Sequence, residues 1–167
     1  MYVQLSIATL TAIALAFPVN HGPRFTFGAT GAITMNVAGD EARYGVVPAE
    51  VAGHPRVTIS LGATRAAGAL LLSVRGDRVP ETGRYPIGTF EAYFAAGSPE
   101  RPLGWFQGES GWVTIAESEA ERVSGEFEIR ARGFTTDDPD NEDQWVTLRG
   151  KFETHGDSTV ATVASRE

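Results

Sequence analysis

Short runs in which apolar and polar residues alternate, each ended by Gly or Pro, fill most of the chain from about residue 32 to residue 152. One run, "RVTISLG", places Val57, Ile59 and Leu61 on one side and polar residues on the other. Successive side chains of a β-strand point to opposite faces, so this alternation predicts strands with one buried and one solvated face. The 19 glycines and 9 prolines favour many turns over long helices.

The spacing of these runs predicts an all-β fold of eight or nine strands, either an antiparallel sandwich or a closed barrel. Consecutive hairpins make a meander the simplest topology, and the pattern does not separate the two architectures. In this reading "TGAITMNV" is a strand and "VPETGRYPIG" is a loop. A length of 167 residues suits one domain, which we place at residues 20–167.

The N-terminal stretch from Leu5 to Phe17 is uncharged, largely apolar and too short to span a bilayer as a helix. Ala14 and Ala16 flank Leu15 in the small-x-small pattern that signal peptidase recognises. We therefore expect residues 1–16 to be a signal peptide and the mature protein to be extracytoplasmic: periplasmic, on the cell surface or secreted. The alternative is a buried first strand or helix. We expect no membrane span.

Composition excludes several chemistries. The formal charge of −7 opposes the phosphate backbone, so we expect no nucleic-acid partner. The absence of cysteine removes thiolate catalysis, thiolate metal sites, disulfides and a lipid-anchoring cysteine.

The stretch "SGWVTIAESEAERVSGEFEIRARG" predicts a hairpin with apolar residues on its inner face. Charged side chains alternate with Phe127 and Ile129, and the charged set must face water, because unpaired ions inside a core are prohibitively costly. A turn centred near Glu121 would place Val113 opposite Ile129. The same register would place Ile115 opposite Phe127.

That register also sets Trp112 beside Arg130 on the outer face, and the next hairpin would bring Trp145 or Thr147 to the other side of Arg130. Cation–π stacking in such a ladder contributes about 0.5–1 kcal/mol per exposed contact. One interpretation is that the two Trp side chains only shield and stiffen the sheet. The other is that they bind a glycan or a protein partner, with Trp112, Arg130, Trp145 and Arg149 as the binding residues.

The acidic segment "DDPDNED" offers carboxylates at alternate positions, Asp138, Asp140 and Glu142, as Ca²⁺ ligands would require. The glycine and spacing of an EF-hand loop are missing, and Pro139 restricts the segment. A solvated hairpin tip whose charge opposes aggregation is the alternative. Weak calcium binding is therefore the one cofactor we consider.

No set of residues in the sequence points to catalysis. The 3 histidines are scattered among presumed loops, and "GESG" lacks the spacing of a nucleophile elbow. Glu109 and Glu117 provide no separation from which a glycosidase pair could be argued. We expect a protein that is not an enzyme.

The motifs "VPETGRYPIG", "SGWVTI", "RVSGEFEI" and "VTLRGKF", with the opening "FTFGATGAITMNVAG", resemble a group of uncharacterised exported bacterial all-β proteins, often lipoproteins. The resemblance extends over most of residues 24–154 and consists mainly of glycine turns and core positions. It implies a β-fold and export, and it carries over no catalytic or binding residue. The missing cysteine departs from the lipoprotein members.

Together these observations predict an exported, non-enzymatic β-domain that acts as a surface or periplasmic binding or structural module, with a protein or glycan partner. The first alternative is a barrel that carries a small apolar ligand, with Phe90, Phe94, Phe127 and Phe152 lining a cavity. An enzyme of unknown class is the third hypothesis.

Overall fold

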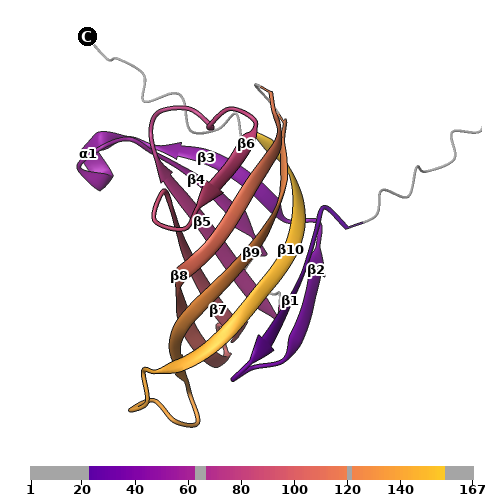
Figure 1. The fold of residues 1–167 in the computed structure, drawn as a ribbon, viewed down its shortest axis with the longest axis vertical. Coiled ribbons are helices and arrows are strands. Elements are labelled where there is room, and N and C mark those ends of the chain that lie inside the picture. The colour runs from indigo at the N-terminus through magenta and orange to yellow at the C-terminus, as the bar shows by residue number, and fades with distance from the viewer. Residues whose placement is uncertain (1–22, 63–66, 120–121, 157–167) are drawn as a thin grey trace, which may run out of the picture.

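Ten strands build a nearly closed barrel in the computed structural model, which describes residues 23–62, 67–119 and 122–156 (Figure 1). The predicted signal peptide therefore lies outside the described residues. In chain order the elements are β1 (Phe25–Gly31), β2 (Met35–Gly39), β3 (Ala42–Val47), the single helical turn α1 (Ala49–Ala52), β4 (Arg56–Leu61), β5 (Gly68–Arg75), β6 (Gly83–Pro86), β7 (Phe90–Ser98), β8 (Arg101–Ser118), β9 (Arg122–Thr135) and β10 (Gln144–Gly156).

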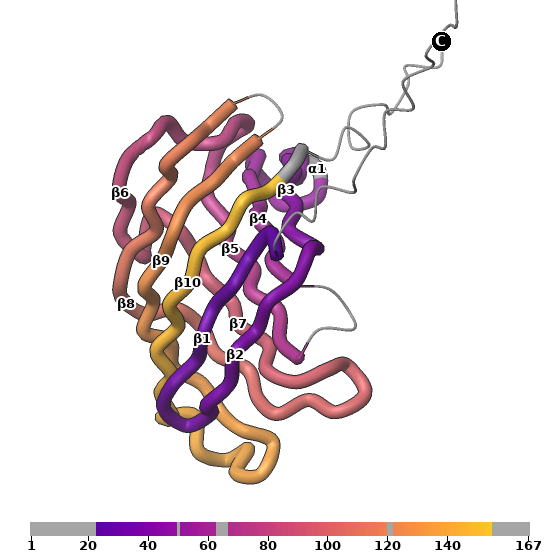
Figure 2. Tube along the Cα trace, turned by 90° about the vertical axis from the view of Figure 1, so that its right-hand side faces the viewer, coloured from indigo at the N-terminus to yellow at the C-terminus, as the bar shows by residue number. Residues whose placement is uncertain are grey.

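Most neighbours in the sheet are consecutive antiparallel strands. β3, β4 and β5 form one such series, and β7, β8, β9 and β10 form another. The two series are joined where β5 pairs with β7. β10 also pairs along its other edge with β1, and its last residues, His155 and Gly156, pair in parallel with Arg43 and Tyr44 of β3. Figure 2 shows β1 against β10, with β2 outside it at the edge of the sheet.

The all-β antiparallel fold predicted from the sequence is confirmed, and the architecture is the barrel-like one. There are ten strands instead of eight or nine. The supposed loop "VPETGRYPIG" contains β6, which pairs only with β8, so that Pro86 is tolerated at a sheet edge. The supposed strand "TGAITMNV" is interrupted by a turn at residues 32–34, because β1 ends at Gly31 and β2 begins at Met35.

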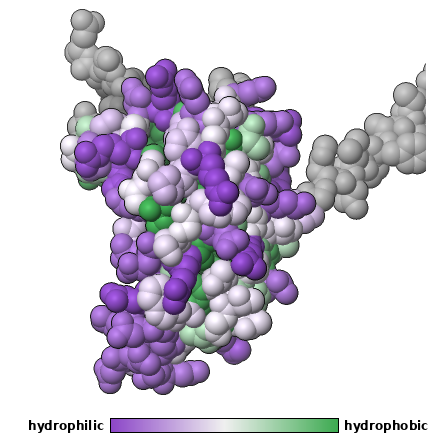
Figure 3. Space-filling view, in the orientation of Figure 1, coloured by the Kyte–Doolittle hydropathy of each residue, from purple (hydrophilic) through white to green (hydrophobic). Residues whose placement is uncertain are grey.

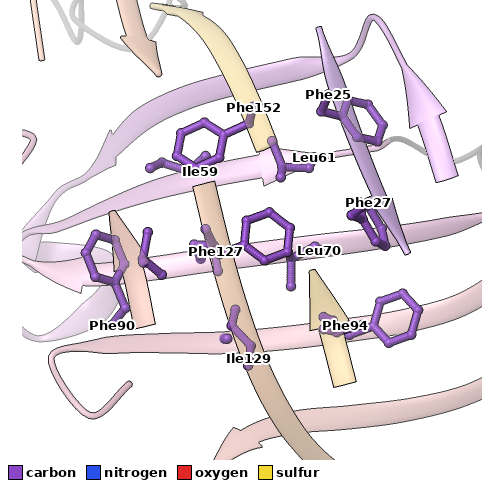
Figure 4. Close-up of a cluster of buried hydrophobic side chains, with 14 of the residues drawn as sticks. Phe25, Phe27, Ile59, Leu61, Leu70, Phe90, Phe94, Phe127, Ile129 and Phe152 are labelled. Carbon is purple, nitrogen blue, oxygen red and sulfur yellow. The ribbon is translucent and has the colours of Figure 1, made fainter. Parts of the chain in front are cut away.

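The interior of the barrel is filled by phenylalanine rings from several strands (Figure 4). Phe27 packs edge-on against Phe94, with 5.8 Å between ring centroids, and Phe127 stacks with Phe152 at 6.5 Å. Each of these four side chains is at most 3% exposed. The buried aromatic side chains are Phe25, Phe27, Phe90, Phe94, Phe106, Phe127 and Phe152.

Glycines lie opposite several of these rings and make room for them. Gly150 of β10 is paired with Phe27 on one side and with Phe127 on the other. A Cβ atom on Gly150 would overlap the Cβ of Phe27 and lie 2.9 Å from Cζ of Phe127. Gly125 stands in the same relation to Phe152, whose Cζ would be 2.9 Å from an added Cβ. Small residues opposite large ones let the rings fill the narrow barrel.

Gly150→Ala should lower the free energy of unfolding by about 1–3 kcal/mol, because the added methyl group overpacks a filled core. Urea denaturation followed by tryptophan fluorescence measures the change. The matched control is Gly45→Ala on β3, where an added Cβ meets no atom within 4 Å. Equal stability of the two variants would contradict this account of the core.

Candidate binding groove on the outer face

A groove of about 550 Å³ crosses the outer face of the barrel from β4 to the loop after β9. The pairing registers place one row of outward residues along it, from Ser60 through Leu71, Tyr93 and Gln107 to Arg132. A second row runs beside the first. Its members are Ala69, Ala95, Trp105 and Phe134.

Large aromatic side chains lie next to small alanine side chains in this groove. Ala69 and Ala95 provide methyl groups only, whereas Tyr93 is 43% exposed and Trp105 is 54% exposed. Trp105 lies opposite Ala95 on one side and opposite Phe134 on the other. Contiguous exposed apolar surface with a polar rim is typical of contact surfaces in proteins.

Three charged residues line the groove: Glu109, Arg132 and Glu142. Arg132 Nε lies 3.6 Å from Glu109 Oε1, and its Nη1 lies 3.4 Å from Asp143 Oδ1. The guanidinium is thus held between two carboxylates, and the groove keeps an excess of negative charge. Gln107 adds a neutral polar side chain.

β8 can present Trp105 and Glu109 here because its outward face changes along the strand. Pairing with β9 shifts between Gly108 and Ser110, so Glu109 is an extra residue in a bulge. Before the bulge Phe106 points inward, and beyond it Val113 does. Odd-numbered residues therefore face outward before the bulge and inward from there to Ile115, where the pairing shifts again.

Tyr93 is oriented by a network that begins on β4. Its hydroxyl donates to Glu91 Oε2 at 3.4 Å, and Arg56 forms an ion pair with the same carboxylate oxygen. Arg56 Nε also donates to Ser73 Oγ at 3.0 Å. The hydrogen bond from Arg56 lowers the pKa of Glu91 most, the charge of Arg56 and the bond from Tyr93 lower it further, and burial acts in the opposite direction.

The four residues predicted to bind all lie on the outer face. Their cross-strand neighbours, however, differ from the predicted ones. Trp112 lies opposite Glu128, and Arg130 lies opposite Ser110 and Thr147. The predicted Trp112–Arg130–Trp145 ladder is therefore wrong. Two separate stacks replace it: Arg84 over Trp112 and Arg130 over Trp145, each at 4.1 Å from the ring centroid.

The register error has a local cause. Val113 pairs with Phe127 and Ile115 with Gly125, two residues away from the predicted partners. The turn closes with reciprocal hydrogen bonds between Glu119 and Arg122, and the pairing shifts once more between Ile115 and Glu117.

Arg149, the fourth predicted residue, lies outside the groove. It forms a two-pronged ion pair with Glu128, at 3.1 and 3.2 Å.

The acidic loop between β9 and β10 protrudes from one end of the barrel and is strongly hydrophilic (Figure 3). Within residues 23–62, 67–119 and 122–156, no three His, Cys, Asp or Glu side chains form a group that could hold a metal ion. The structure thus does not assemble Asp138, Asp140 and Glu142 as calcium ligands. Asp138 instead accepts hydrogen bonds from Asn141 at 3.2 Å and Gln144 at 3.4 Å.

The carrier alternative receives no support from the core, because Phe90, Phe94, Phe127 and Phe152 are packed among other buried side chains.

Sequence reasoning overlooked Tyr93 and Trp105. A signal for Tyr93 was present, since the alternation in "TFEAYFAA" puts this ring on the same face as Glu91. Its meeting with Trp105 depends on the pairing of β7 with β8, which the pattern alone does not provide.

No protein-family model, no curated protein and no solved structure matches the chain. Among the described residues, no helix is both long enough and apolar enough to cross a membrane. Because no curated protein matches the chain, the kind of ligand that the groove could bind has to be inferred from the geometry of the groove.

Acidification should weaken the Arg56–Glu91 pair. The folded state lowers the pKa of Glu91, so the stabilisation is fully present above the ordinary pKa and is lost as the pH falls through the lowered value. Because the pair is partly exposed, we expect about 1 kcal/mol or less at neutral pH, a change in Tm of about 4 °C or less.

The comparison is Tm against pH for the wild type and Glu91→Gln, by circular dichroism. The two curves should differ at pH 7 and converge in acid. Glu100→Gln, at the exposed turn after β7, is the control and should leave the curve unchanged. A difference that persists undiminished in strong acid would contradict the ion-pair explanation.

Proposed function

We propose that this protein is an extracytoplasmic, non-enzymatic binding module whose ligand lies in the groove lined by Tyr93, Ala95, Trp105 and Arg132. The exposure of Tyr93 and Trp105, which both adjoin Ala95 in the groove, is the observation that carries the proposal. Burying these rings under a ligand would release water from a large apolar area that folding leaves exposed.

The rigidity of the surrounding sheet supports a binding role. β5, β7, β8 and β9 are each paired along both edges, so the backbone beneath the groove is fixed before a ligand arrives. Arg132 and Tyr93 are further held by Glu109 and Glu91. A site ordered in advance loses little conformational entropy on binding.

A catalytic role for the two groove carboxylates has less support. Glu109 and Glu142 are both exposed, and Glu109 lies against a guanidinium. A carboxyl group that acts as a general acid near neutral pH is usually kept protonated by an apolar environment.

A nuclear magnetic resonance screen with mixed fragments of saccharide, aromatic and peptide character tests the proposal. Binding fragments should shift the amide signals of Gly62, Ala95 and Gly133 and the indole signal of Trp105. Trp105→Ala should weaken such binding by roughly tenfold, from the loss of stacking and buried area. Trp112→Ala, at a tryptophan outside the groove, is the control and should leave it intact. Shifts that avoid the groove for every fragment would overturn the proposal.

Export is tested separately by the intact mass of the protein purified from its producing cells. Removal of the first 16 residues by signal peptidase should give a polypeptide that begins at Phe17. A mass that retains these residues would contradict the extracytoplasmic assignment and leave the groove unaffected.

A further inference from the structure

We infer that the groove binds a neutral, β-1,4-linked glycan chain, with a sugar ring stacked on Trp105. This inference rests on the proposed function and goes on to name the class of ligand. It is carried by three features of the groove: its mixture of aromatic and planar polar side chains, its charge, and its course across the strands.

The lining matches the two surfaces of a sugar ring. A pyranose has apolar C–H faces and a rim of hydroxyl groups, and C–H groups are attracted to the electron-rich face of an indole or phenol ring. Trp105 and Tyr93 provide such faces, both well exposed. Gln107, Glu109 and Arg132 lie on the same outer surface and offer amide, carboxylate and guanidinium groups to hydroxyls.

The backbone of the groove disfavours an extended peptide. The strands beneath it are paired along both edges, so most of their N–H and C=O groups are already used. A peptide that binds to a sheet by strand addition needs a free edge for its own backbone groups. The hydroxyls of a glycan need only the side chains that the groove presents.

The charges set the kind of glycan. Glu109 and Glu142 outnumber Arg132 among the lining residues, and Arg132 already interacts with Glu109 and with Asp143 beyond the groove. A uronic acid chain would bring further carboxylates close to these groups, and like charges repel. A neutral chain avoids this cost.

The length of the groove fits an extended chain of several sugars. It spans five neighbouring strands, β4, β5, β7, β8 and β9, which at about 4.8 Å per strand spacing gives a length of about 19 Å. The outward rows run straight across these strands, from Ser60 at one end to Arg132 near the other. β-1,4 linkage produces an extended chain that can follow a groove of this length.

Isothermal titration calorimetry on the full chain tests the inference with four hexasaccharides. The neutral probes are mannohexaose, cellohexaose and chitohexaose. The acidic probe is hexamannuronate, which has the same β-1,4 linkage as mannohexaose and differs by its carboxylates. At least one neutral probe should bind, and hexamannuronate should bind at least about tenfold more weakly, which corresponds to about 1.4 kcal/mol of repulsion.

Three variants locate the binding. Trp105→Ala should weaken the neutral probe by roughly tenfold, and Trp112→Ala should not. The double variant Glu109→Gln with Glu142→Gln should reduce the difference in affinity between mannohexaose and hexamannuronate. Circular dichroism checks that each variant remains folded, and chromatography of the recovered probe should show an intact hexasaccharide.

The outcomes separate this inference from the proposed function. If fragments bind in the groove but none of the neutral hexasaccharides does, or if a peptide fragment binds there in preference, the glycan assignment fails and the binding module stands. If hexamannuronate binds as tightly as mannohexaose, the charge argument fails. Hydrolysis of a probe would overturn the non-enzymatic assignment.

Discussion

The packing of phenylalanine rings against facing glycines is the constraint on which the rest of the structure depends. Seven phenylalanine side chains are buried in the described part of the chain, and they fill the interior of the barrel together with smaller apolar residues. They fit because Gly125 and Gly150 leave the inner surface open where Phe152, Phe27 and Phe127 meet. With the inside filled, the groove lies on the outer surface, where two rows of side chains from β4 to β9 form it.

Much of the fold follows from the two-residue period of the sequence. The inward residues of β4, Val57, Ile59 and Leu61, are those that alternation selects, and all three are buried. Antiparallel hairpins follow from the short spacing between runs. What alternation does not contain is pairing between distant strands. β1 pairs with β10, and β6 pairs with β8. Both pairings depend on how all the strands are arranged in the sheet, so a local sequence pattern does not predict them.

The candidate site was harder to predict from the sequence than the fold, because β-bulges determine which side chains of β8 face outward. Alternation that continues through one unbroken hairpin predicts Trp112 beside Arg130. The turn between Glu119 and Arg122 and the extra residue near Ala116 each shift the pairing by one position, so the partner is Glu128. The extra Glu109 brings Trp105 to the outer surface. A bulge depends on how two strands twist together, which single residues do not reveal. The stack of Arg130 on Trp145 nevertheless forms, since it joins adjacent rows of β9 and β10.

The parallel pairing of His155 and Gly156 with β3 has a consequence for the order of folding. These two pairs, with the β1–β10 ladder, join segments more than a hundred positions apart in the chain. Hairpins such as β7–β8 close short loops and cost little entropy, whereas joining distant segments costs more and is rewarded only when the intervening strands are in place. We therefore expect the wall that holds the groove to be assembled while the barrel is still an open, curved sheet. Ring closure then comes last, and the seam between β3 and β10 is the region from which unfolding begins.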